Sequence, residues 1–145
     1  MVALGLVSSC GGGETEPQRA TEAVESLQGD MAAGRLEAVC AAMTERVHRQ
    51  IGSIGHGRRP TTCERDLRDL VEGTHAAAGA GDGESLRRAP RPEVVDVAVG
   101  RAGDAAVATL TLGGDPFRVP LAKEDGEWKL DDLLGATGPI PRALE

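Results

Sequence analysis

Apolar residues recur at helical spacing through the first half of the chain. Thr15 and Gln18 form a capping box with Pro17 in the first turn, and Gly34 is a typical residue to end a helix. Between these signals one helical face carries Ala20, Val24, Leu27 and Met31. The pattern therefore predicts a first helix that starts after Thr15, ends at Gly34 and buries this face.

Two further helical segments are predicted before residue 78. Apolar residues at helical spacing cover residues 36–54, with a break near Thr44, and a glycine-rich loop follows at 55–60. Thr61 and Glu64 form a second capping box, and the helix that they open ends near Ala77. A polar connector rich in Gly, Pro and Arg covers residues 79–91.

The second half of the chain changes to the period of β-strands. Strands are predicted at residues 93–99, 105–112, 117–122 and 127–130. The connections are short, and Asp125-Gly126 is typical of a type I′ hairpin turn, so the strands form an antiparallel meander. Pro120 lacks a backbone donor, so its strand needs a bulge or an outward-facing nitrogen there. Helices followed by a curling meander indicate an α+β fold.

The first ten residues end in Val7-Ser8-Ser9-Cys10, directly before three glycines. This segment resembles the lipobox of bacterial lipoproteins, which implies cleavage before Cys10, acylation of its thiol and a tether on the outer face of a membrane. Residues 1–10 are then a truncated signal, because the apolar run is short and no basic residue precedes it; the simplest account is a natural start further upstream. The alternative is an ordinary N-terminus with a chance cysteine. Residues 11–16 form a flexible tether.

Composition limits the function classes. The length of 145 residues leaves room for one domain after the leader and tether. A net charge of −7 argues against nucleic acid as a partner and against adsorption to anionic lipid, so membrane contact should come from the acyl chains alone. Arginine far outnumbers lysine, which occurs only at Lys123 and Lys129, and this bias is typical of a GC-rich genome.

Cys40 and Cys63 remain as a pair once Cys10 is assigned to acylation. Each lies on the apolar face of its predicted helix, and an extracytoplasmic location is oxidising. We therefore expect a Cys40–Cys63 disulfide, with two buried free thiols as the alternative.

Four features together resemble the NTF2-like (cystatin-like, SnoaL-type) lipoproteins of actinobacteria. They are the helix end at residues 29–35, the helix start at 36–40, the helix start at 62–64 and the hairpin 121–130 with its Gly-Glu-Trp-Lys sequence. The resemblance covers residues 17–134, with a loose tail at 135–145. It implies helices packed on a curved antiparallel sheet that forms a cone with a cavity, and in many members a homodimer.

Enzymes of that family, such as ketosteroid isomerases and SnoaL-type cyclases, place acid and base side chains in the cavity. Tyr is absent from this chain, and Asp96 is the one acidic residue flanked by apolar strand residues. An inward Asp96 would be a candidate base with a raised pKa, whereas strand alternation places it in solvent, opposite Val95 and Val97. Trp128 is the second cavity candidate; we expect it to be buried near Leu110, Val119 and Leu130.

No metal site and no cofactor are expected. His48, His56 and His75 lack the spacing of two ligands on one helix, and Asp131-Asp132 reads as an exposed pair without the further oxygens of a calcium loop. No residue is assigned a catalytic role. The sequence thus predicts a noncatalytic, membrane-anchored surface lipoprotein that binds a small apolar ligand or an envelope partner protein. The alternative is a SnoaL- or ketosteroid-isomerase-like enzyme that acts on a small hydrophobic substrate.

Overall fold

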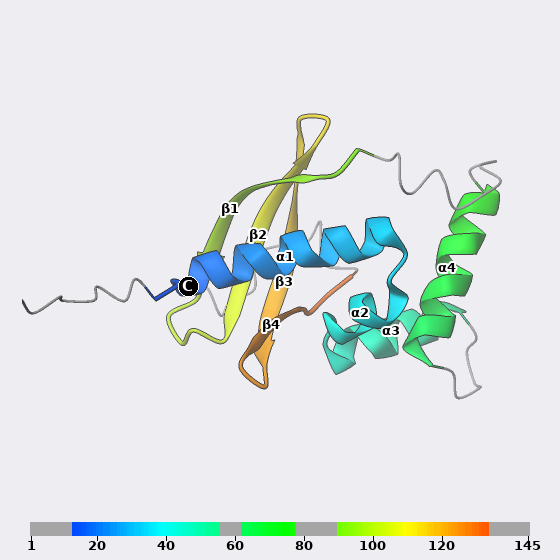
Figure 1. Cartoon of the computed structure of the whole chain (residues 1–145), viewed down its shortest axis with the longest axis horizontal. Coiled ribbons are helices and arrows are strands. Elements are labelled where there is room, and N and C mark those ends of the chain that lie inside the picture. Colours follow the sequence, from blue (N-terminus) through cyan, green and yellow to red (C-terminus); the bar gives the residue numbers. More distant parts are fainter. Residues whose placement is uncertain (1–12, 56–61, 78–89, 134–145) are drawn as a thin grey trace, which may run out of the picture.

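The computed structural model describes residues 13–55, 62–77 and 90–133, in which helices precede an antiparallel sheet (Figure 1). This arrangement confirms the predicted α+β class. Residues 1–10 with Cys10, His56, Thr61 and the tail 135–145 lie outside the described residues. The elements are α1 Glu16–Ala33, α2 Leu36–Ala41, α3 Glu45–Gly55, α4 Cys63–Ala77, β1 Glu93–Val99, β2 Ala105–Leu112, β3 Asp115–Glu124 and β4 Glu127–Leu130.

Helix α1 has the ends that its sequence predicts. The Thr15 side chain accepts a hydrogen bond from the Gln18 backbone while Gln18 binds back to the Thr15 backbone, and Gly34 closes the helix at φ 70°. Ala20, Val24 and Leu27 are buried. Met31 is 43% exposed, so its predicted place on the buried face is wrong. Met31 belongs to neither part of the hydrophobic core, whereas Leu27, one turn earlier, packs among the helices.

The expected break near Thr44 is also present. The stretch 36–54 divides into α2 and α3, and Met43 between them forms a parallel bridge with Leu130. Ile54 is half exposed near the end of α3, contrary to its predicted place on the apolar face. Helix α4 is capped by Thr62, whose hydroxyl accepts a hydrogen bond from the Arg65 backbone. The sequence predicted this role for Thr61.

The sheet is a meander in the order β1-β2-β3-β4 with antiparallel pairing throughout. Asp125 and Gly126 both have positive φ, at 55° and 83°, as a type I′ turn requires. The predicted third strand is longer than expected at both ends, because Gly113 and Gly114 alone make the preceding turn. The Pro120 carbonyl accepts from the Asp131 backbone, so the missing donor of Pro120 faces the end of β4 and costs the sheet little.

Strand β1 contains a bulge that the sequence did not indicate. Val94 pairs with Leu110 and Asp96 pairs with Thr109, which leaves Val95 without a partner in the register. Val95 is 60% exposed, so its expected inward position is wrong. Because the bulge inserts one residue, Val94 before it and Val97 after it point to the same side of the sheet. Both pack on the side of α1.

The hydrophobic core has two parts that α1 joins. Helix α1 crosses the sheet, and α2, α3 and α4 gather around its C-terminal end (Figure 1). Between α1 and the sheet, the buried residues are Ala20, Val24, Ala106, Ala108, Leu110, Leu121 and Trp128. The second part lies among the helices and comprises Leu27, Val39, Cys40, Met43, Val47, Ile51, Leu67 and Leu130. Of the expected neighbours of Trp128, Leu110 shares its part of the core, Val119 packs against both parts and Leu130 belongs to the second.

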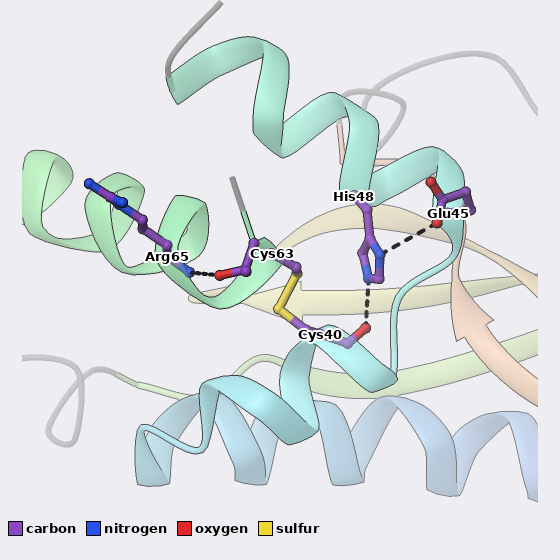
Figure 2. Close-up of a disulfide and its surroundings, with 6 residues drawn as sticks. Cys40, Glu45, His48, Cys63 and Arg65 are labelled. Carbon is purple, nitrogen blue, oxygen red and sulfur yellow. Dashed lines mark hydrogen bonds and ion pairs between the residues drawn. A yellow bond between two sulfur atoms is a disulfide. The ribbon is translucent and has the colours of Figure 1, made fainter. Parts of the chain in front are cut away.

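A disulfide joins α2 to the first residue of α4. Cys40 and Cys63 are bonded with a Cα–Cα distance of 6.0 Å, as expected from the sequence (Figure 2). Beside it, His48 Nε2 donates to the Cys40 carbonyl oxygen at 2.8 Å, and His48 Nδ1 lies 3.8 Å from Glu45. The bond and the histidine together attach α3 and α4 to α2.

Reduction of this disulfide should destabilise the domain clearly. The bond closes a separation of 23 residues, for which chain entropy gives about 3 kcal/mol. We expect reductant to lower the melting temperature by about 10 °C or more. The Cys40→Ala/Cys63→Ala double variant should melt near the reduced protein and show no response to reductant. An equal melting temperature with and without reductant would contradict the assignment.

Candidate functional site

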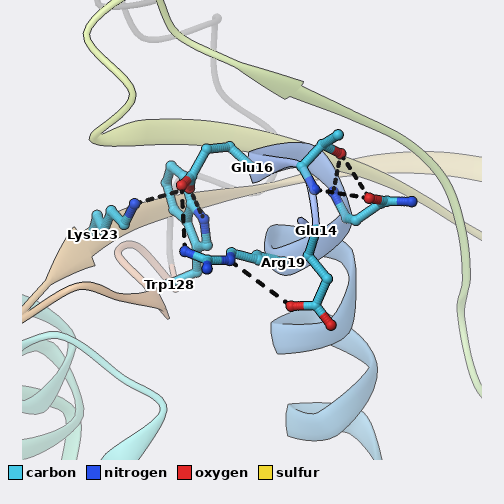
Figure 3. Close-up of polar contacts among 7 residues, drawn as sticks. Glu14, Glu16, Arg19, Lys123 and Trp128 are labelled. Carbon is cyan, nitrogen blue, oxygen red and sulfur yellow. Dashed lines mark hydrogen bonds and ion pairs between the residues drawn. The ribbon is translucent and has the colours of Figure 1, made fainter. Parts of the chain in front are cut away.

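A polar cluster lies over the indole of Trp128 where α1 begins (Figure 3). Trp128 is 6% exposed, and its Nε1 donates to Glu16 Oε2 at 3.0 Å. Lys123 Nζ lies 2.9 Å from the same oxygen and 5.6 Å from the centroid of the indole ring. Glu16 is thereby bound to two side chains of the sheet. Its carboxylate also lies in the first turn of α1, where the helix dipole favours negative charge.

These contacts change the titration of Glu16. The hydrogen bond from Lys123 lowers the pKa of Glu16 below its ordinary value of 4.5, with help from Trp128 and against a smaller desolvation effect. Arg19 adds a weaker attraction at 3.6 Å and also faces Glu14 at 3.9 Å. The cluster therefore holds an ionised carboxylate against a buried tryptophan.

An open groove of about 640 Å³ runs beside this cluster between α1, α2 and β4. We call it the α1–α2 groove. Trp128 and the small residues Ala23, Ser26, Ala38, Ala41, Ala42 and Gly126 line part of it. Its charged lining residues are Glu14, Arg19, Glu22, Asp30, Glu127 and Lys129. Trp128, the predicted cavity residue, thus lines a groove that is open to solvent, with charges of both signs around a small apolar surface.

A second open groove, of about 460 Å³, lies on the other flank of α1 along β1. We call it the β1 groove; its lining residues are Pro17, Gln18, Thr21, Glu22, Glu25, Val94, Val95, Asp96 and Val97. Asp96 is exposed and pairs with Thr109, whose neighbours Ala108 and Leu110 face α1. The carboxylate of Asp96 therefore belongs to the opposite face of the sheet, as strand alternation predicted.

The remaining predicted site residues do not converge. His48 is bound to the Cys40 carbonyl, and the side chain of His75 lies outside the described part of the chain. Asp131 and Asp132 are half-buried, so their predicted exposure is wrong. Thr44 donates to Asp131, and Arg46 pairs with both carboxylates, which binds the end of β4 to α3.

Within residues 13–55, 62–77 and 90–133, no group of three His, Cys, Asp or Glu side chains is placed to hold a metal ion. Over the same residues, no helix has the length and apolar character needed to cross a bilayer.

Comparisons with known proteins give no assignment. No protein family matches the chain, and neither the curated proteins nor the solved structures contain a significant match. Function must therefore be argued from the chain itself.

Glu16 is the site residue that sequence reasoning missed. It had been placed in the tether, yet it binds Lys123 and Trp128, which lie 107 and 112 positions away. The sequence did contain one indication, because an acidic residue directly after an N-cap is held in the first turn of the helix, where the helix dipole stabilises its charge. Its partners depend on how α1 crosses the sheet, which no local pattern contains.

Stability should depend on pH through Glu16. Its folded-state pKa lies below 4.5, so the stability that it adds is present above that value and is lost as pH falls through the lower folded value. We expect Glu16→Gln to lower the melting temperature at pH 7, and the difference from wild type to shrink as the pH falls below 4.5. Thermal melts of both proteins across this range test the prediction.

Glu14→Gln is the matched control, because Glu14 is largely exposed and only distantly paired with Arg19. It should melt like wild type at every pH. A pH-independent difference for Glu16→Gln would mean that shape, and not charge, is the cause.

Proposed function

We propose that this chain is the noncatalytic domain of a membrane-anchored lipoprotein outside the cytoplasm, and that it binds a partner protein of the cell envelope. The α1–α2 groove carries this proposal. Protein interfaces commonly combine a small apolar centre with charged residues around it, and the groove has both. A small apolar ligand would favour a more enclosed and more apolar site.

The location rests on two features of the chain. The segment that ends in Cys10 resembles a lipobox and is followed by glycines that suit a tether. The Cys40–Cys63 disulfide suits an oxidising compartment, since such bonds are rare in the cytosol. Both features support the same side of the membrane.

We also propose that the fold is an NTF2-like cone. In such a cone, helices precede an antiparallel meander and pack on one of its faces. Helix α1 precedes all four strands in the sequence and crosses one face of their sheet, which supports this proposal. Dimerisation through the open face of the sheet stays a prediction. The enzyme alternative has less support, because the candidate base Asp96 is exposed on the face of the sheet that is turned away from α1.

The anchor predicts a simple fractionation result. Expressed with a complete upstream signal in a bacterium that processes lipoproteins, the protein should fractionate with membranes and carry diacylglycerol on Cys10. Cys10→Ala should leave it unprocessed or release it. Mass spectrometry of the membrane extract identifies the modification. A wild-type protein that is soluble in the cytoplasm with an unmodified Cys10 would contradict the location.

The groove predicts a site-specific contact. A photoreactive residue in place of the exposed Glu127 should form one discrete protein adduct in intact cells. Ala41→Arg fills the groove from the last residue of α2 and should abolish the adduct. Ala33→Arg is the matched control, because Ala33 is an exposed last residue of α1 outside the groove lining. It should leave the adduct unchanged.

Two other outcomes decide against a protein partner. An adduct that survives Ala41→Arg lies outside the groove. A native mass spectrum that shows a bound lipid or other small apolar molecule, without any protein adduct, would favour a small ligand instead.

A further inference from the structure

The two outer edges of the sheet differ. The edge of β4 is covered, since Leu130 donates to the Ala42 carbonyl and accepts from the Thr44 backbone, both at 2.9 Å. Strand β1, at the other end of the order, pairs with β2 alone among the described residues. Over residues 13–55, 62–77 and 90–133, the edge of β4 is therefore paired at Leu130, whereas the outer edge of β1 offers backbone donors and acceptors.

The open edge lies beside the β1 groove. Helix α1 forms one wall of this groove and β1 forms the other, with Val94, Val95 and Val97 in its lining. Val95 is 60% exposed because of the bulge. An unpaired strand edge beside a helix, with an apolar side chain turned outward, is the geometry in which an extended peptide adds as a further strand.

The charge of the groove is one-sided. Glu22 and Glu25 line it from α1, and Asp96 lies at its β1 side with its carboxylate on the far face of the sheet. Among the described residues of the lining there is no Lys or Arg. Within the described residues none of the three carboxylates has an ion-pair partner. The acidic groups of the α1 wall attract a basic segment and repel an acidic one.

We propose that β1 binds an extended, basic segment of another protein by strand addition in the β1 groove. The segment alternates basic residues, which face Glu22 and Glu25 of α1, with small apolar residues, which contact Val95. This inference is independent of the proposed partner in the α1–α2 groove, because the two grooves lie on opposite flanks of α1.

A second copy of this chain is a poorer occupant. Two β1 edges brought together would place both sets of these carboxylates against each other, in molecules that each carry a net charge of −7. Like charges placed opposite each other on neighbouring strands destabilise their pairing. The bulge and the acids thus protect the edge from self-association while they admit a basic strand.

The test uses the isotope-labelled full chain and a capped peptide of about seven alternating lysine and valine residues, the length of β1. On titration, backbone amide shifts should change in residues 93–99 and 17–25, with Kd below about 1 mM. The same peptide with every amide N-methylated keeps its charge and loses its donors, and it should bind at least about tenfold more weakly. A glutamate–valine peptide should not bind.

Variants of the chain test the surface itself. Glu25→Gln should weaken binding of the lysine–valine peptide by at least about threefold. The matched control is Glu37→Gln, which makes the same charge change at an exposed acid on α2 and should leave Kd unchanged. Neither Glu25 nor Glu37 lines the α1–α2 groove, so the photo-crosslink from position 127 should persist in both variants.

Several results would overturn the proposal. They are no shift change at about 1 mM peptide, shift changes confined to another surface, or equal binding of the N-methylated peptide, which would indicate charge contact without strand addition. Concentration-dependent shifts of β1 without peptide would identify a second copy as the occupant instead.

Discussion

The packing of α1 across the sheet is the constraint on which the rest of this structure depends. Ala20 is fully buried in the same cluster as Ala106 and Ala108, so small side chains meet between the helix and the sheet. Close-packed interiors leave little space for a larger group at such a contact. The short side chains fix the height of α1 above the sheet, and that height brings Glu16 within hydrogen-bond distance of Lys123 and Trp128.

The same helix joins two cores that neither half could complete alone. Val24 packs toward the sheet, and Leu27, one turn further, packs with the helical part. Leu130 carries β4 into that second part, where its backbone also binds the segment between α2 and α3. With one Trp, one Phe and no Tyr in the chain, little aromatic surface is available, and the disulfide adds a restraint where the helical part is small.

Local chemistry in the sequence predicted the ends of elements well and their exposure less well. The capping box at Thr15, the left-handed Gly34 and the Asp125-Gly126 turn depend only on residues close in sequence, and all three are present. The exposure of Met31 and Ile54 and the burial of Asp131 depend on which element lies opposite. Helical periodicity identifies an apolar face but not the length over which a partner covers it.

The candidate site was predictable only in part for the same reason. Trp128 was predicted to be buried where the last strand packs on the helical layer, and it is. Its bond to Glu16, the bulge at Val95 and both grooves arise from contacts between segments far apart in the chain. Strict alternation assigns each strand residue to one face of the sheet, and a single inserted residue reverses that assignment for the residues on one side of it.

The two grooves are related through the helix that separates them. Glu22 lines both, and the buried stripe of α1 lies between their walls. A sideways displacement of α1 over the sheet would therefore widen one groove and narrow the other. Glu16 opposes such displacement by binding α1 to β3 and β4, so this one carboxylate helps to determine the shape of each surface as well as the stability of the fold. A domain built in this way is suited to present surfaces of fixed shape, which is what binding requires.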